Sequence, residues 1–217
     1  MTNLASFTRA TQRMLPVILL ADVSSSMSGD KITSLNCAVR EMLTTFKDES
    51  ATRAEIHLAV ITFGGVAKMH QALSPVGQVS WSDMSVNGHT PLGEALALAE
   101  TLIDDKEALP SNAYRPTVVL VSDGYPNDEW ESVLNRFNSG KRCGKTQRLA
   151  MAIGSDADED MLRRFLNGGE EPLFHAGDAS QIASFFRYVS QSVAQRSRSA
   201  NPNKLPEIPR PEDMDEF

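Results

Sequence analysis

The chain has 217 residues, of which 41% are hydrophobic and 23% are charged, and its formal net charge is -7. This length suits one sizeable α/β domain, and the composition is that of a soluble protein with a packed core. The acidic balance argues against nucleic-acid binding, because contacts to phosphate need a basic surface. One short basic cluster, made of Lys141, Arg142, Lys145 and Arg148, is interpreted as a solvated loop.

The cysteines and the apolar segments exclude further classes of protein. Cys37 and Cys143 are far apart and neither belongs to a CxxC pair, so neither a zinc site nor a disulfide framework is indicated. The apolar run at residues 14–21 is too short to span a bilayer, and it lacks the basic flank of a signal peptide. We therefore expect a soluble, cytoplasmic protein that makes no membrane contact.

Continuous apolar runs predict the strands of a central sheet. After a polar segment at residues 1–12, expected to be flexible, strands buried on both faces are predicted from unbroken hydrophobic stretches. A more amphipathic run fits a hairpin edge, and the segment that follows it is rich in Pro, Gly, Asn and Ser and predicts a loop. The strands are expected at residues 15–20, 56–63, 66–73 (the edge), 117–121, 148–153 and 173–174, and the loop at residues 74–89.

Helices are predicted between these strands from apolar residues at helical spacing. One follows the turn at residues 28–30, and another opens at Thr90-Pro91, where Thr90 is a good N-cap and Pro91 a favoured first residue. Three more are expected, at about residues 129–137, after Asp156, and at about residues 179–196.

This alternation of strands and helices predicts one α/β domain over residues 13–196, with a doubly wound, mainly parallel sheet and helices on both faces. The segment 197–217 contains four prolines and ends in acidic residues, which predicts a flexible tail.

Five oxygen-bearing side chains follow predicted strands or begin a predicted helix. Asp22, Ser24 and Ser26 come directly after the first strand, Thr90 stands at a helix start, and Asp123 follows another buried strand. Ligand sites in open α/β sheets lie at the carboxyl ends of the strands, so these side chains are expected to meet there.

Hydroxyl and carboxylate oxygens are ligands for hard cations, so the expected ion is Mg²⁺, or alternatively Mn²⁺ or Ca²⁺, rather than zinc. Only two of the five side chains carry charge. An ion held in this way keeps open or water-filled positions, and an Asp or Glu from a partner protein could take one of them.

The same residues carry a family resemblance. The string DVSSS resembles the D-x-S-x-S signature of the metal-ion-dependent adhesion site of von Willebrand factor A domains, and GHTPLGEAL and VSDG resemble the second and third loops of that site. The resemblance spans roughly residues 15–196. Any one motif is weak, but the three in this order and at these separations are specific. Two positions depart from the pattern, because Ser25 and His89 stand where the family often has glycine.

The resemblance implies roles for the five residues and for the chain. Ser24, Ser26 and Thr90 would bind the metal directly, and Asp22 and Asp123 would bind it directly or through water. The implied function is metal-dependent binding of a protein partner, without catalysis. The narrower resemblance is to bacterial TerY-like proteins of tellurium-resistance systems, which implies a stress-response or phage-defence role and kinase or phosphatase partners.

Other interpretations remain at this level. The Asp22 string alone could cap a helix, and the loops could form a scaffold that binds no ion. A metal-dependent phosphohydrolase using the same oxygens is the main alternative. The sequence contains no G-x-S-x-G elbow, Walker A motif or GxGxxG motif. Finally, the acidic residues 212–216 could occupy a neighbouring molecule's metal site.

Overall fold

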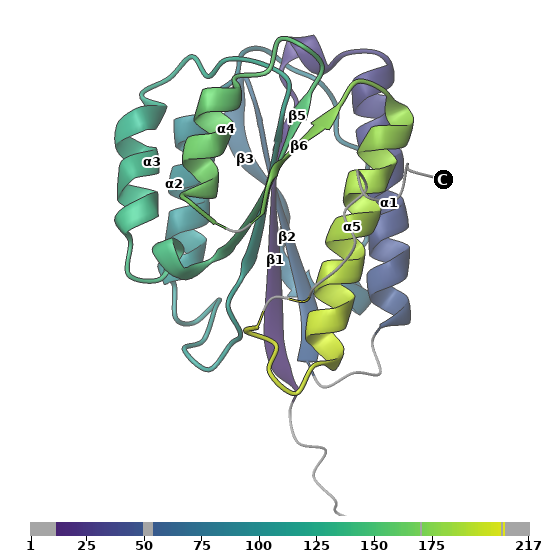
Figure 1. Ribbon diagram of the computed structural model, residues 1–217, viewed down its shortest axis with the longest axis vertical. Coiled ribbons are helices and arrows are strands. Elements are labelled where there is room, and N and C mark those ends of the chain that lie inside the picture. Colours follow the sequence, from purple (N-terminus) through teal and green to yellow (C-terminus); the bar gives the residue numbers. More distant parts are fainter. Residues whose placement is uncertain (1–11, 50–53, 170, 205, 207–217) are drawn as a thin grey trace, which may run out of the picture.

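A twisted six-stranded sheet runs through the centre of the domain (Figure 1). The computed structural model describes residues 12–49, 54–169, 171–204 and 206. Within them the strand order is β3-β2-β1-β4-β5-β6, and every neighbouring pair is parallel except β2 and β3. The strands are β1 (Arg13–Asp22), β2 (Ala54–Gly64), β3 (Val66–Pro75), β4 (Thr117–Ser122), β5 (Gln147–Ile153) and β6 (Leu173–Ala176). The predicted doubly wound, mainly parallel α/β fold is thus confirmed.

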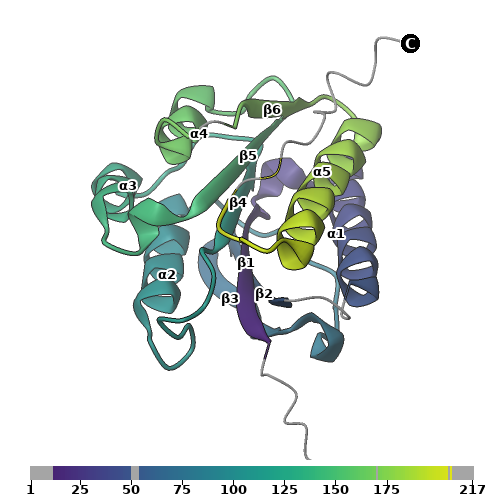
Figure 2. The ribbon, with the colours of Figure 1, turned by 60° about the horizontal axis from the view of Figure 1, so that its bottom comes forward.

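Helices cover both faces of the sheet (Figure 2). On one face lie α1 (Asp30–Asp48) and α5 (Ala179–Arg198), and on the other lie α2 (Leu92–Asp104), α3 (Trp130–Ser139) and α4 (Glu159–Leu166). Short single-turn helices also form: η1 (Ser25–Met27), η2 (Val76–Gln78) and η3 (Cys143–Lys145).

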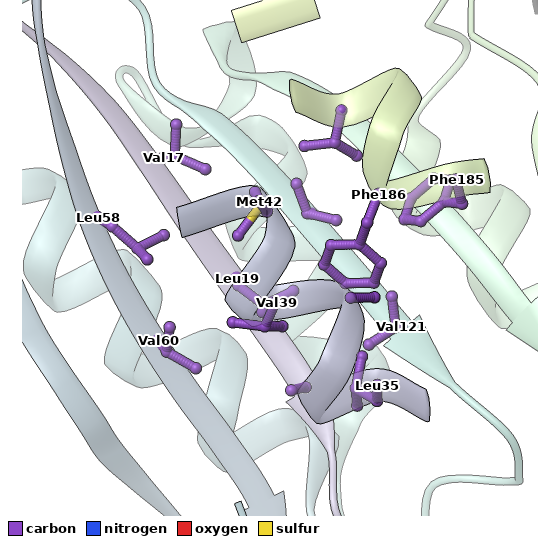
Figure 3. Close-up of a cluster of buried hydrophobic side chains, with 14 of the residues drawn as sticks. Val17, Leu19, Leu35, Val39, Met42, Leu58, Val60, Val121, Phe185 and Phe186 are labelled. Atoms are coloured by element: carbon purple, nitrogen blue, oxygen red, sulfur yellow. The ribbon is translucent and has the colours of Figure 1, made fainter. Parts of the chain in front are cut away.

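The core is divided by the sheet into two layers, because successive residues of a strand point to opposite faces. Leu19 belongs to the layer under α1 and α5, whereas its neighbours Ile18 and Leu20 belong to the layer under the other three helices. All three are 0–1% exposed. Figure 3 shows the first layer, where Phe186 of α5 and Val39 of α1 pack over the strands. Burial on both faces explains why these strands read as unbroken apolar runs.

Two element boundaries differ from the sequence-based expectation. The helix expected to open at Thr90 begins at Leu92, and its N-cap position is Pro91. At the other end of the chain, α5 continues to Arg198, and Ser197 is fully buried although it was assigned to the flexible tail. The predicted flexible lead-in at residues 1–12, except for Gln12, and most of the predicted tail lie outside the described residues. No helix in the described ranges combines the length and the apolar character needed to cross a bilayer.

Candidate metal centre

The first and third predicted motifs meet where the direction of sheet winding changes. β1 and β4 are neighbours, yet the strands that follow each of them extend the sheet in opposite directions. Such a switch point opens a crevice at the carboxyl ends of the two strands. Asp22 is the last residue of β1, and Asp123 follows the last residue of β4. The sheet topology therefore brings both carboxylates to one rim.

Asp22 is fixed by hydrogen bonds to both of its carboxylate oxygens. Oδ1 accepts from the backbone N–H of Ser24 at 2.8 Å, and Oδ2 accepts from the hydroxyl of Ser122 at 2.6 Å. The first bond closes a tight turn at the end of β1, and the second joins β1 to β4. Asp22 is thereby locked in one orientation with none of its surface exposed.

A chain of hydroxyls connects the first loop to Asp123. The Oγ atoms of Ser24 and Ser26 lie 2.9 Å apart, and the Ser26 hydroxyl donates to Oδ1 of Asp123 at 2.7 Å. Because the Ser26 proton is directed to Asp123, the Ser24 hydroxyl is the donor between the two serines. Lys31, in the first turn of α1, donates from Nζ to the other oxygen of Asp123, Oδ2, at 2.6 Å.

The second predicted loop is held against the first by its backbone. The carbonyl of Gly88 accepts from the N–H of Ser25 at 2.9 Å and from its hydroxyl at 3.1 Å. The departure from glycine at position 25 therefore adds a contact between the loops. Gly88 has a φ of 54°, and a Cβ there would lie 2.5 Å from the Cα of Gly65. Only glycine allows the two backbones to approach so closely.

Thr90 lies on this second loop, at 7% exposure, and is fixed by the third loop. Its N–H donates to Oδ1 of Asn127 at 3.0 Å, and its carbonyl accepts from the N–H of Asn127 at 3.1 Å. Thr90 is therefore not the N-cap of α2. The free N–H groups of that helix are capped by Asp128, whose Oδ1 and Oδ2 accept from Gly93 and Glu94 at 3.0 Å each.

Two buried carboxylates face a single cation at this rim. Asp22 and Asp123 are 0% and 1% exposed, and among the described residues Lys31 is the only cation that forms an ion pair with either of them. Burial raises the pKa of Asp22 above its ordinary value, and the nearby negative charge of Asp123 adds to this rise, although hydrogen bonds from Ser122 and Ser24 oppose it. A second positive charge would stabilise this arrangement.

The spacing of the oxygens at this rim fits an octahedral dication, which would supply the second positive charge. Ligand oxygens about 2.1 Å from Mg²⁺ are about 3.0 Å apart at neighbouring positions. The Ser24–Ser26 and Ser26–Asp123 oxygen pairs, at 2.9 and 2.7 Å, are close to that value. In the described part of the chain, no three His, Cys, Asp or Glu side chains gather as a metal site. The candidate set instead has two carboxylates supplemented by hydroxyls.

Three residues near the site were missed by sequence reasoning. Ser122 anchors Asp22, Lys31 pairs with Asp123, and Asn127 holds Thr90. Ser122 adjoins Asp123 in the same motif, so its position was a usable signal. The other two gave no local signal, because their partners lie 92 and 37 residues away in the chain.

Comparisons with solved structures show the same fold in several proteins. A von Willebrand factor type A protein from Catenulispora acidiphila is 18% identical with a TM-score of 0.64, over 83% of this chain and 42% of that chain. The pilus adhesin SpaC from Lactobacillus rhamnosus GG, in its open conformation, is 13% identical with a TM-score of 0.69, over 85% and 30%. Proximal thread matrix protein 1 from the mussel byssus, solved with a zinc-occupied MIDAS motif, is 16% identical with a TM-score of 0.61, over 84% and 46%. The chain thus corresponds to less than half of each.

Sequence comparison gives the family directly. No curated protein matches the sequence. The profile of the family described as von Willebrand factor type A domain matches residues 17–188, which include all five candidate ligands. This match covers most of the chain and agrees with the observed strand order and helix layers. The chain belongs to the von Willebrand factor type A domain family.

Proposed function

We propose that this domain binds a partner protein through a divalent cation, and that an Asp or Glu side chain of the partner completes the coordination. Ser24, Ser26 and Thr90 would hold the ion directly, and Asp22 and Asp123 would hold it directly or through water. The ion, Mg²⁺ or alternatively Mn²⁺ or Ca²⁺, would supply Lewis acidity toward the incoming carboxylate.

The observation that carries this proposal is the buried acidic pair beneath a rim of hydroxyls. Asp22 and Asp123 are inaccessible, whereas Ser26 is exposed, so the cluster opens to solvent on the Ser26 side. A partner carboxylate could therefore approach the ion from the Ser26 side. Neutral hydroxyl ligands leave the ion enough net charge to attract that carboxylate.

The surface around the cluster suits a protein partner. Tyr125, two residues after Asp123, is 70% exposed, and exposed tyrosines are common in binding interfaces. On another side a pocket of about 400 Å³ extends from Lys31 between the amino ends of α1 and α5, and Gly154 and Asp178 line it. A partner loop that reaches the ion would have an aromatic contact and a recess beside it.

The metal site is tested by calorimetric titration of Mg²⁺ and Mn²⁺ into the wild type, Ser26→Ala and Ser28→Ala. Ser28 is an exposed serine of the same loop and serves as the matched control. We expect Ser26→Ala to weaken binding about tenfold or more, as loss of a direct ligand should, and Ser28→Ala to bind like the wild type. Asp22→Ala should abolish binding. Equal affinities in all four proteins would refute the site.

The partner's role is tested by affinity capture from the native host with the wild type and the same two serine variants. Proteins captured by the wild type and by Ser28→Ala, but lost with EDTA or with Ser26→Ala, would support metal-mediated recognition. Capture that is unaffected by EDTA would instead indicate a scaffold that needs no ion.

Two narrower proposals rest on the sequence resemblance. The motifs resemble those of TerY-like proteins, and on that basis we propose a stress-response or phage-defence role with a kinase or phosphatase as partner. Identification of the captured proteins tests it. We also propose that the domain is not an enzyme. Turnover of generic phosphoesters with Mn²⁺, abolished by Asp123→Ala, would contradict this and favour a phosphohydrolase.

A further inference from the structure

A second pocket lies at the opposite end of the domain from the candidate metal centre. It has a volume of about 440 Å³ and is formed by the loop after α2, the segment before β4 and the turn around η3. The first residues of β1 lie beside this pocket, because the N–H of Tyr114, which lines it, donates to the carbonyl of Met14. In Figure 1 this end, with the start of β1, is at the bottom. A volume of this size suits a small-molecule ligand.

The charged residues lining this pocket are all basic. They are Lys106, Arg115, Lys141, Arg142 and Lys145. In a chain with a net charge of -7, five cations around one recess are a marked concentration of positive potential. The interpretation of Lys141, Arg142, Lys145 and Arg148 as a solvated loop is wrong for Arg148. This side chain is only 6% exposed, and its Nη1 donates to the carbonyl of Phe165 at 2.6 Å.

These five cations lack acidic partners within the described residues, where none of them forms an ion pair. Asp105, one of the two acidic residues adjacent to Lys106, is engaged locally, because its Oδ1 accepts from the N–H groups of Glu107 and Ala108. Surface cations are usually mixed with acids that offset their charge. Here no acidic side chain lines the recess, although Asp104, Asp105 and Glu107 flank Lys106 in the sequence.

Arg142 has an unused donor at the pocket wall. Its Nη2 donates to the carbonyl of Leu109 at 2.6 Å, whereas its Nη1 is buried and has no hydrogen-bond partner. A buried guanidinium N–H without an acceptor is costly, so a shift of the Arg142 side chain that brought Nη1 to a ligand oxygen would be favourable.

A buried arginine behind the pocket adds to the positive potential. Arg196 is 1% exposed, and its guanidinium donates to Thr117, Gln147, and the carbonyls of Pro202 and Arg115. None of these acceptors is a carboxylate. Burial, together with the nearby Arg115 cation, lowers the pKa of Arg196 to about 10, so it remains charged at neutral pH.

We propose that this pocket binds a small soluble compound that carries two or more phosphate groups. Lys141, Arg142 and Lys145 would contact the phosphate oxygens, for which Arg and Lys are the usual ligands. Leu109 and Tyr114 would pack against the less polar part of the compound. The site is independent of the proposed metal centre, because it shares no residue with it.

The test is calorimetry with inorganic pyrophosphate and with ATP, in EDTA and at physiological ionic strength, so that metal binding plays no part. Three variants are compared with the wild type: Arg142→Gln, Lys141→Gln/Lys145→Gln, and the control Lys68→Gln/Arg187→Gln. The double lysine variant changes only exposed side chains and should fold. The control removes two exposed cations elsewhere on the surface.

We expect saturable binding by the wild type and the control, and a Kd about tenfold or more higher for the other two variants. Absence of saturable binding to the wild type, or equal loss in the control, would overturn the proposal. A parallel sedimentation assay uses phosphatidylcholine vesicles with and without phosphatidylglycerol. Binding to the vesicles that contain phosphatidylglycerol, without binding to free pyrophosphate, would assign the phosphate to a lipid headgroup. That result would also overturn the proposal.

Discussion

Lys31 Nζ lies 2.6 Å from Oδ2 of Asp123, so an ammonium group already neutralises one of the two buried carboxylates of the candidate metal centre. A dication bound to the same carboxylate would be repelled by this charge. We therefore expect Lys31→Met to bind Mg²⁺ more tightly, by about tenfold for a repulsion of ~1.4 kcal/mol, and to be less stable without metal. Calorimetry measures the first effect, with Lys68→Met as control, and a lower Mg²⁺ affinity would show that Lys31 assists the ion instead.

Gly88 should be essential for the junction between the first two loops. Gly88→Ala adds a Cβ that would lie 2.5 Å from Gly65 Cα, at a φ of 54° that alanine disfavours. We expect a loss of at least ~1–2 kcal/mol in the free energy of unfolding and weaker Mg²⁺ binding. Gly77→Ala is the matched control, because its added Cβ meets nothing within 4 Å. Urea denaturation distinguishes the two, and equal stabilities would contradict the close approach.

Asp128 should stabilise α2 from outside the helix. It accepts from the N–H groups of Gly93 and Glu94, so Asp128→Ala leaves two donors at the helix start without a partner. The expected loss is about 1 kcal/mol, as for removal of an N-cap side chain. Chemical denaturation measures it against Glu129→Ala, an exposed neighbour. If Glu129→Ala lost as much free energy of unfolding as Asp128→Ala, the hydrogen bonds from Asp128 to the start of α2 would have no special role in stability.

The two cysteines should differ in reactivity. Cys37 is exposed, whereas Cys143 is buried and burial raises the pKa of its thiol to about 12. A thiolate is the reactive form, so only Cys37 should react rapidly with a chromogenic disulfide reagent in the native protein. Cys143 should react after unfolding in denaturant. Rapid reaction of two thiols in the native wild type, or of the single remaining thiol in native Cys37→Ser, would contradict this assignment.

The start of α5 should weaken in acid. The pKa of Asp178 lies below its ordinary value of 3.8, because its carboxylate accepts hydrogen bonds from the N–H of Gln181 and from Ser180. Its contribution to stability is therefore complete above the unfolded value and is lost as the pH falls through the lower folded value. Urea denaturation over a pH series should show a wild-type advantage over Asp178→Asn at neutral pH that disappears in acid.

The fold, and the meeting of Asp22, Ser24, Ser26 and Asp123 at one rim, could be predicted from the sequence because their signals are local. Asp22 and Asp123 each follow an unbroken apolar strand, and parallel strands end at a common rim. The metal-ligand roles of all five residues remain predictions.

The remaining features depend on tertiary contacts that no short pattern encodes. Thr90 looked like a helix cap because threonine commonly is one, but Asp128 reaches α2 from the third loop and takes that role. Arg148 looked solvated among other basic residues, yet carbonyls of Phe165 and Cys143 accept its hydrogen bonds inside the protein. In both cases the deciding partner lies on another element.

The bond from Ser26 to Asp123 spans 97 residues of chain, and the bond from Ser122 to Asp22 spans 100. A nascent chain that ends before β4 therefore contains four of the five proposed ligands but lacks Asp123, which completes the set. A dication would join late, after β4 has docked beside β1. By mass action it would then shift the folding equilibrium toward the native domain, and more strongly at higher ion concentration.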